Sequence, residues 1–325
     1  MEGLTGLLGA RPDVLAAAVV LDLLLGDPVY RFHPVRLIGA SLIMIESGLR
    51  RIGANGYGGG IALFVILASI WIFIAAFLQL GFTALGPWPA WLFHVFIVYS
   101  LLALGDLLRA VWRVERALEN QDLASARFAI SRLVGRDTDR MDEGACRRAA
   151  IESLSENLPD GFISAIFWYV LLGLPGIVVF KVVSTMDSMV GYRTPRYLRF
   201  GRCGARLDDA MNFIPARLTW LLIALSALVV PSGSPAKALA FGYRHARLLP
   251  SPNSGWPEAA TAGAIQRRLL GPIWKDGQLV TDIWLGDPND PPVSTHADMK
   301  RATAVNVMAG LVAAALAVAA LVGVA

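Results

Sequence analysis

The feature that most constrains this chain is an apolar run without a single charge, from Ile61 to Leu85. About 20 apolar residues in a helix span the roughly 30 Å hydrocarbon core of a bilayer. Of the 325 residues, 55% are hydrophobic and only 17% are charged, whereas soluble domains carry about 25% charged residues. Because helices satisfy their own backbone hydrogen bonds in lipid, the sequence predicts an all-α integral membrane protein.

Similar apolar segments recur along the chain, and we expect about four to six membrane-embedded helices in one multi-pass domain covering residues 1–325. The segments are 14–25, 61–85, 90–105, 163–184 and 303–325, with a weaker sixth at 217–230. Between them lie polar stretches that we expect to be partly helical, partly irregular, and to form the cytoplasmic, functional side. These are residues 26–60, 106–162, 185–216 and 231–302, of which the last is predicted to hold at most short helices.

Segment 163–184 admits two interpretations. Gly173, Pro175 and Gly176 divide it into halves of about ten residues, each too short to cross a bilayer alone. The polar stretches on both sides are rich in arginine, which favours the cytoplasmic side for both. A re-entrant hairpin satisfies this and would bring Asp160 near Asp187, but a full span kinked at Pro175 remains open.

Several functional classes are excluded by what the sequence lacks. With only Cys146 and Cys203, the chain has no cysteine-based metal site or disulfide framework of its own. The net charge of +4 first indicates membrane orientation, and no basic stretch interleaved with aromatics predicts nucleic-acid binding. P-loop, HExxH and GxSxG motifs are absent. The glycine-rich stretch 56–60 lacks a P-loop lysine, and we expect a flexible connection there.

The first polar cluster follows the first apolar segment. Asp27, His33 and Arg36 lie in the motif GDPVYRFHPVRLIG, and they would form a polar rim at the membrane surface. The alternative is a simple helix exit at which Arg36 extends its charged end to the interface.

The second cluster begins with GRDT, which contains Arg136 and Asp137, and continues with ESLSENLPDG. Glu152 and Glu156 are four residues apart and would share one face of a helix, where like charges repel unless a cation intervenes. A Mg²⁺ ion would explain the pair, and solvated acids near a helix end are the alternative. Asn157 and Asp160 complete this stretch, in which Asp160 could also belong to a plain turn.

The third and fourth clusters combine acids, amides and arginines. DSMVGYR contains Asp187, Ser188, Tyr192 and Arg193, and LDDAMNFIPAR contains Asp208, Asn212 and Arg217. Asp208 and Asn212 have helical spacing, and the guanidinium groups suit phosphate oxygens. SPNSGWPEA contains Asn253, Trp256 and Glu258, and it predicts either backbone held close to a ligand or a structured turn.

These motifs, in this order from about residue 20 to 290, resemble the CobD/CbiB family of cobalamin-biosynthesis proteins, the adenosylcobinamide-phosphate synthases. One departure is Leu158-Pro159, where we expect Thr-Val in the family; the acids stay in place. The resemblance implies a multi-pass enzyme of the inner membrane that uses ATP to join an amino alcohol to a corrinoid. Its substrates would be adenosylcobyric acid and (R)-1-amino-2-propanol phosphate, or an aminopropanol or ethanolamine variant.

This resemblance gives roles to the clusters. Divalent metal, expected to be Mg²⁺, would be held by Glu152, Glu156, Asp160 and Asp187. Catalytic proton transfer and activation would involve His33, Asp27, Glu156 and Asp160. Substrate and phosphate groups would contact Arg36, Arg136, Asp137, Asn157, Ser188, Tyr192, Arg193, Asp208, Asn212, Arg217, Asn253, Trp256 and Glu258.

Trp256, Trp274 and Trp284 would either cover the corrin ring or anchor the protein at the membrane interface. Expected partners are the bilayer and other late cobalamin-assembly membrane enzymes, with no nucleic acid.

Two other functions stay open. A corrinoid transporter or binding scaffold would concentrate ionisable residues at mid-span depth and show repeated halves. A membrane lipid-phosphate transferase would share metal and phosphate sites but would need its own motif.

Overall fold

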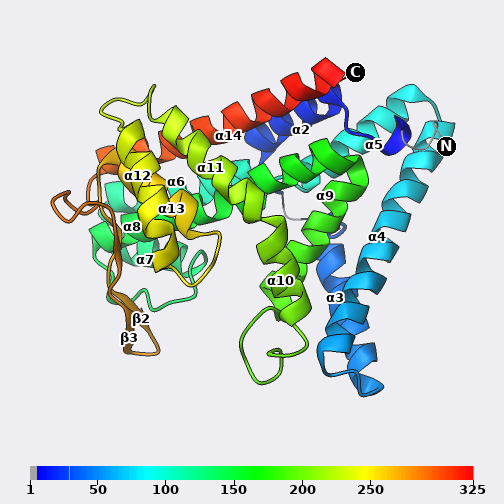
Figure 1. Ribbon diagram of the computed structural model, residues 1–325, viewed down its shortest axis with the longest axis horizontal. Coiled ribbons are helices and arrows are strands. Elements are labelled where there is room, and N and C mark those ends of the chain that lie inside the picture. The colour runs from blue at the N-terminus through cyan, green and yellow to red at the C-terminus, as the bar shows by residue number, and fades with distance from the viewer. Residues whose placement is uncertain (1–5, 29, 325) are drawn as a thin grey trace. The chain divides into compact units, whose positions relative to one another are not determined.

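The computed structural model describes residues 6–28 and 30–324, most of them in helices (Figure 1). The chain divides into two compact units, each built from discontinuous segments. The first comprises the described residues of Met1–Ala103, Ser164–Asn212 and Ala314–Ala325, and the second comprises Leu104–Ile163 and Phe213–Ala313. The single domain over residues 1–325 stays a prediction.

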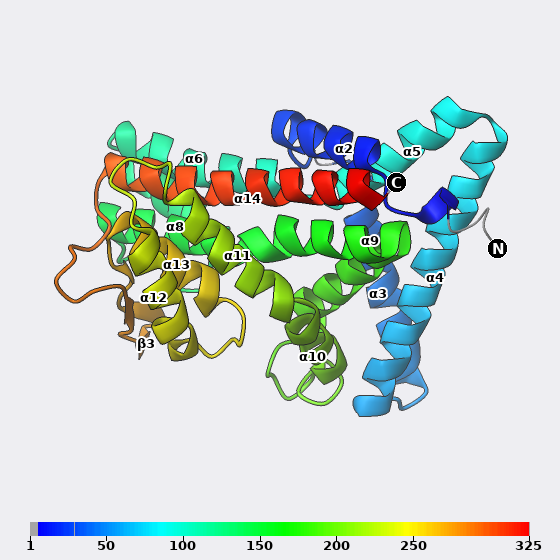
Figure 2. The same cartoon turned by 45° about the horizontal axis from the view of Figure 1, so that its top comes forward.

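The first unit is a set of apolar helices packed through side chains of α3, α4 and α9. Three of its helices begin with proline, which fits the first helical turn because the missing N–H would have no partner there. The helices are α2 (Pro12–Leu25), α3 (Pro34–Arg51), α4 (Tyr57–Ala84), α5 (Pro87–Ser100), α9 (Ser164–Val190) and α10 (Arg202–Met211). A buried cluster joins them, formed by Ile38, Leu42, Leu63, Leu67, Ala68, Val182, Met186, Val190 and Phe200. Figures 1 and 2 show α3 and α4 side by side.

Helix α9 is broken at its middle. Gly173 has φ 63° and ψ −148°, which are not helical, so α9 consists of two helices joined at a kink. In both views the ribbon of α9 changes direction sharply along its length (Figure 2). The predicted interruption is therefore present at Gly173, two residues before Pro175. The return of this segment to one membrane face stays a prediction.

The glycine-rich stretch 56–60 is not a flexible connection, and that expectation was wrong. Helix α4 begins at Tyr57 and includes Gly58, Gly59 and Gly60. A side chain at Gly59 would collide with the carbonyl of Ala54, and one at Gly60 with the carbonyl of Phe200. The glycines allow close packing of backbone against backbone.

The second unit is also mainly helical. Its helices are α6 (Leu104–Glu119), α7 (Leu123–Ser131), α8 (Glu143–Leu158), the π-helical turn η1 (Pro159–Ile163), α11 (Phe213–Ser226), α12 (Pro235–His245), η2 (Ala246–Leu248) and α13 (Gly255–Ile265). Side chains of Asp122, Asp142 and Ser234 accept hydrogen bonds from the first turns of α7, α8 and α12, as N-caps do. Helix α13 is buried along almost its whole length and packs against α8, α11 and α12, consistent with its nearly uniform small apolar sequence.

Four short strands were not expected from the sequence. Strands β1 (Leu269–Leu270) and β4 (Trp284–Leu285) pair antiparallel, with Leu269 opposite Leu285. Strands β2 (Ile273–Lys275) and β3 (Gln278–Thr281) form a hairpin closed by Asp276 and Gly277. Both turn residues have positive φ, 52° and 75°, as Asp-Gly turns of this length require.

The last helix, α14 (His296–Val324), begins seven residues before the expected apolar segment. Among the described residues, three helices are long and apolar enough to cross a membrane. They are Tyr57–Ala84, Glu143–Val190, which includes the kink at Gly173, and His296–Gly323, and a fourth would result if Pro87–Ser100 and Leu104–Glu119 form one broken span. The prediction of an all-α multi-pass membrane protein is confirmed.

Candidate active site

The second unit contains a cluster of three glutamates around one arginine, which we call the acid cluster: Glu152, Glu156, Glu258 and Arg136. Glu152 and Glu156 lie one turn apart on α8, as predicted, and Glu258 lies on α13. Arg136 donates from Nη1 and Nη2 to the two oxygens of Glu152, at 3.1 and 2.7 Å. The side chains of Arg136 and Glu152 are only 10% and 13% exposed. This paired geometry is strong and directional. A metal ion between Glu152 and Glu156 stays a prediction.

Glu258 is the most deeply placed carboxyl of this cluster. The residue is 2% exposed. Burial raises the pKa of the Glu258 carboxyl well above its usual range, and the negative charges of Glu156 and Glu152 raise it further. A buried carboxyl beside two others is expensive unless a cation or a proton compensates it. The acid cluster is therefore suited to bind a further positive charge.

The local sequence explains how α8 presents its acids. Asp142 caps the helix through a 2.6 Å hydrogen bond from the N–H of Ala145. At its other end α8 continues into the π-helical turn η1, in which Asp160 lies. Single π-helical turns often occur at functional sites because they turn side chains away from the regular helical register. Asn157 donates to the carbonyl of Ser153 at 2.8 Å.

The GRDT motif anchors the β2–β3 hairpin. The carboxylate of Asp137 accepts hydrogen bonds from the N–H groups of Asp276 and Gly277, at 3.2 and 2.8 Å. The N–H of Asp137 donates to the carbonyl of Trp274 at 2.8 Å. In this structure Asp137 thus holds the turn, and direct contact with substrate stays a prediction. Its neighbour Arg136 reaches the acid cluster.

Arg217, predicted to bind phosphate, holds the SPNSGWPEA loop. Its guanidinium donates to the side-chain oxygen of Asn253 at 2.9 Å and to the carbonyl of Pro252 at 3.2 Å. The same group lies over the rings of Phe213 and Trp256, a favourable cation–π arrangement. Of the two predictions for this loop, ligand contact or structured turn, the contacts described here are those of a structured turn.

The tryptophans expected in the polar loops lie in α13, β2 and β4, each beside an arginine. Trp256 is contacted by Arg217, Trp274 by Arg140, and Trp284 by both Arg148 and Arg268. Covering of a corrin ring by any of them stays a prediction.

In the first unit, the predicted residues of α9 and α10 form a second polar group. Asn212 donates to Asp208 at 3.0 Å and accepts from the hydroxyl of Ser164 at 2.5 Å. The Asp208–Asn212 contact has the helical spacing predicted. Burial raises the pKa of Asp208 to about 7, and the negative charge of Asp187 also raises it, while the hydrogen bond from Asn212 lowers it.

We expect Asp208 to make stability depend on pH. Because its folded-state pKa, about 7, lies above the ordinary value of 3.8 for an aspartate, the folded protein retains a proton that the unfolded chain loses. This contribution to stability is complete below about pH 4 and is lost as the pH rises through 7. Thermal unfolding of wild type and Asp208→Asn between pH 5 and 8 tests this, with Asp122→Asn as control. A flatter profile for Asp208→Asn is expected; identical slopes would contradict it.

The other predicted residues of the first unit fall into two places. His33 and Asp27 form a 2.6 Å contact between Nε2 and Oδ1, in which His33 is buried. Arg36 donates to the carbonyl of Tyr30 at 3.4 Å. Of the three residues predicted to form a polar rim, His33 and Asp27 are therefore in contact, and Arg36 bonds to the backbone of Tyr30.

In DSMVGYR, Ser188 donates to the carbonyl of Thr185 at 3.0 Å, and Tyr192 is exposed. Burial raises the pKa of the Asp209 carboxyl, and the positive charges of Arg206 and Arg193 partly oppose this rise. The four predicted metal ligands consequently divide between the units: Glu152, Glu156 and Asp160 in the second, and Asp187 in the first.

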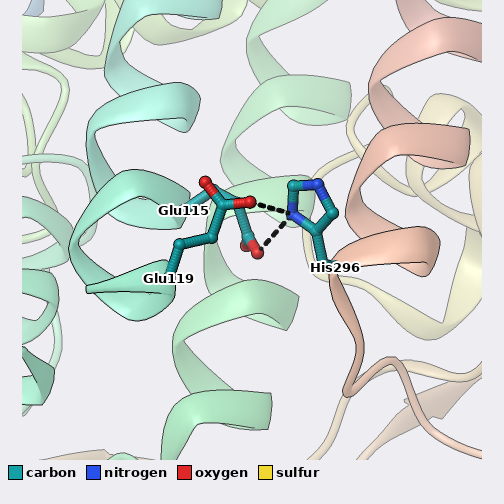
Figure 3. A group of neighbouring side chains, drawn as sticks. All are labelled: Glu115, Glu119 and His296. Atoms are coloured by element: carbon teal, nitrogen blue, oxygen red, sulfur yellow. Dashed lines mark hydrogen bonds and ion pairs between the residues drawn. The ribbon is translucent and has the colours of Figure 1, made fainter. Parts of the chain in front are cut away.

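One cluster was not found from the sequence. Glu115 and Glu119 on α6 and His296 at the start of α14 bring one ligand atom each within 4.8 Å of one another (Figure 3). Nδ1 of His296 lies 2.8 Å from Glu115 and 3.2 Å from Glu119. The four-residue spacing of Glu115 and Glu119 could have indicated that they share one face of a helix. Their contact with His296 could not be predicted, because His296 lies 181 residues after Glu115. Arg147 also contacts both oxygens of buried Glu115, so an ion-pair network accounts for these contacts.

Comparison with known proteins decides the family. The family model described as "CobD/Cbib protein" matches residues 15–306. The chain belongs to the CobD/CbiB family. The match covers every motif discussed above, including the acid cluster and the polar group of the first unit.

Individual relatives agree with this assignment. A "Cobalamin biosynthesis protein CobD" of a Sinorhizobium species is 40% identical over 316 residues, covering 93% of this chain and 97% of the relative. The protein of the same name from Pelobacter propionicus is 41% identical over 277 residues, covering 85% of each chain. "Cobalamin biosynthesis protein CbiB" of Salmonella typhimurium is 38% identical over 275 residues, covering 83% of this chain and 85% of the relative. No solved structure matches significantly.

Proposed function

We propose that this CobD/CbiB protein is an ATP-dependent amide ligase of cobalamin biosynthesis. It would join (R)-1-amino-2-propanol phosphate, or an aminopropanol or ethanolamine variant, to the free propionate of adenosylcobyric acid, giving adenosylcobinamide phosphate. Support comes from the family match and the names of the relatives. The observation that carries the proposal within the structure is the acid cluster, in which Arg136 pairs with Glu152 beside the carboxyls of Glu156 and Glu258.

The chemistry requires activation of a carboxylate, because a carboxylate is a poor electrophile. Transfer of the γ-phosphoryl group of ATP to a propionate oxygen gives an acyl phosphate and ADP. The amine nitrogen then attacks the carbonyl carbon, the bond from that carbon to the phosphate oxygen breaks, and inorganic phosphate leaves. The attacking ammonium must first lose a proton to a base. Several anionic groups meet in one site, so fixed positive charge is needed to stabilise the transition state.

The residues of the acid cluster fit Mg²⁺, which prefers carboxylate oxygens and substrate phosphates. Glu156 and Glu258 would hold it, with Asp160 and Glu152 as further ligands. The fit rests on the buried Glu258 carboxyl, whose neighbours Glu152 and Glu156 are acidic. When bound, the ion would neutralise phosphate charge. Arg136 keeps Glu152 fixed through its two hydrogen bonds and offers positive charge beside the acids.

For proton transfer we propose the His33–Asp27 pair. The short contact orients the imidazole, as a carboxylate does in other His-based catalysts. Asp187, also predicted to bind metal, lies in the first unit, and its role stays a prediction. By the positive-inside rule, we place the arginine-rich polar stretches in the cytoplasm and the protein in the inner membrane, where other late cobalamin-assembly enzymes would be its neighbours.

Product formation by purified protein tests this function. We expect wild type in detergent, given adenosylcobyric acid, aminopropanol phosphate, Mg²⁺ and ATP, to form amide and ADP. Glu156→Gln should lower the rate at least about 100-fold, the size of effect expected from losing a transition-state charge contact. Glu143→Gln, an exposed change on the same helix, should retain activity.

A transporter or scaffold would instead bind the corrinoid and return it unchanged. Loss of activity in both variants, or in neither, would remove the acid cluster from the mechanism.

A further inference from the structure

A pocket lies beside the acid cluster, and of its lining residues the proposed function uses only Arg136. Three arginines line it, Arg136, Arg140 and Arg148, together with Trp274 and other residues of the GRDT loop, α8 and the β-hairpin. All belong to the second unit. Its volume is about 180 Å³, well below the roughly 300–1,000 Å³ of pockets that enclose a whole small ligand. A pocket of this size suits one charged group of a ligand.

The acids of this pocket are already engaged. The two oxygens of Asp137 accept the N–H groups of Asp276 and Gly277, and Asp142 accepts the N–H of Ala145. Their negative charge is thereby partly compensated by backbone dipoles. The pocket consequently presents more positive than negative potential to a ligand.

The arginines, by contrast, retain donors. Arg136 is nine-tenths buried, and its Nε makes no hydrogen bond to any residue within the described part of the chain. A buried donor without an acceptor is unfavourable, because it has lost its hydrogen bonds to water. Arg140 is exposed and lies over the ring of Trp274, with 5.1 Å between guanidinium carbon and ring centre. Arg148 is fixed by hydrogen bonds to the carbonyls of Leu270 and Val293.

We propose that this pocket binds phosphate oxygens of a substrate, with Arg136, Arg140 and Arg148 as the positively charged groups. Arginine forks pair with phosphate in two-point hydrogen bonds. Arg136 touches both sites, since its Nη atoms bind Glu152 and its Nε has no partner. It would thus couple phosphate binding to the acid cluster. The inference rests on the proposed function for the source of the phosphate, which is either ATP or the amino-alcohol phosphate.

Binding of inorganic pyrophosphate, ATP and aminopropanol phosphate to purified protein, each measured by calorimetry, tests the site. Arg140→Gln should weaken pyrophosphate binding roughly tenfold, as expected for loss of a hydrogen bond to a charged group. The matched control Arg116→Gln, on α6 and outside the pocket, should bind as wild type does. An equal loss in both variants, or no loss in Arg140→Gln, would overturn the proposal.

The same variants identify the phosphate and separate this inference from the function. A higher KM for ATP alone in Arg140→Gln assigns the pocket to the nucleotide, and a higher KM for aminopropanol phosphate alone assigns it to the amine. Amide formation with both KM values unchanged would overturn the phosphate site and leave the ligase function standing. Arg140-dependent pyrophosphate binding without any amide product would support the site and contradict the function.

Discussion

Arg136→Gln is expected to lower the free energy of unfolding by about 3–5 kcal/mol, the usual effect of removing one partner of a buried ion pair. Glu152 would be left without its two hydrogen bonds, next to Glu156 and the buried Glu258. The variant should also lose ligase activity, because the acid cluster would lose the arginine that is hydrogen-bonded to Glu152. Thermal unfolding in detergent measures the effect.

Two comparisons make that result specific. Arg132→Gln removes an exposed arginine close by in sequence and should leave stability unchanged within about 0.5 kcal/mol. Combining Arg136→Gln with Glu152→Gln should recover much of the lost stability, since no unpaired charge remains at that position. If Arg136→Gln were as stable as wild type, the ion pair could not be holding the acid cluster together.

Gly173→Ala is expected to disrupt the kink of α9. The φ of 63° combined with a ψ of −148° is accessible essentially to glycine alone, and a Cβ there would collide with backbone atoms of Leu8 and Gly9. Strain of this kind amounts to about 1–3 kcal/mol before the collision is counted. We expect a large loss of folded protein, measured as the monodisperse fraction after detergent extraction.

Gly81→Ala is the matched control for this experiment. Gly81 lies in the apolar helix α4, and a Cβ there would meet no atom within 4 Å. That variant should gain about 0.5–1 kcal/mol from higher helix propensity. Equal yields of the two variants would mean that the kink does not depend on glycine at position 173.

The helices could be predicted because their signal is local. An uncharged apolar segment long enough to cross a bilayer as a helix is compatible with few other structures. Helices α4 and α9 accordingly lie within a few residues of the expected segments. Spacing of four residues likewise placed Asp208 beside Asn212 and Glu152 beside Glu156 on one helix face. The predicted apolar segment, 303–325, begins after the start of α14, because the first turns of this helix, from His296 to Arg301, are mainly polar.

The strands and the ion-pair partners could not be predicted because they depend on contacts distant in sequence. Strands of two to four residues carry no usable periodicity, and the β2–β3 hairpin is held by Asp137, 139 residues before Asp276. The contact between Glu115 and His296 could not be predicted for the same reason. Composition suggested phosphate binding for Arg217, whereas its hydrogen bonds to the 251–256 loop appear only in three dimensions.

The most direct test of the central claim follows an oxygen atom through the reaction. Adenosylcobyric acid carrying ¹⁸O in its free carboxylate is incubated with wild-type protein, ATP, Mg²⁺ and aminopropanol phosphate, and the products are analysed by mass spectrometry. The proposed ligation predicts one ¹⁸O in inorganic phosphate, one in the amide, and ADP in equal amount. Unchanged corrinoid that stays bound to folded protein, or amide formed with no label in phosphate, would contradict it.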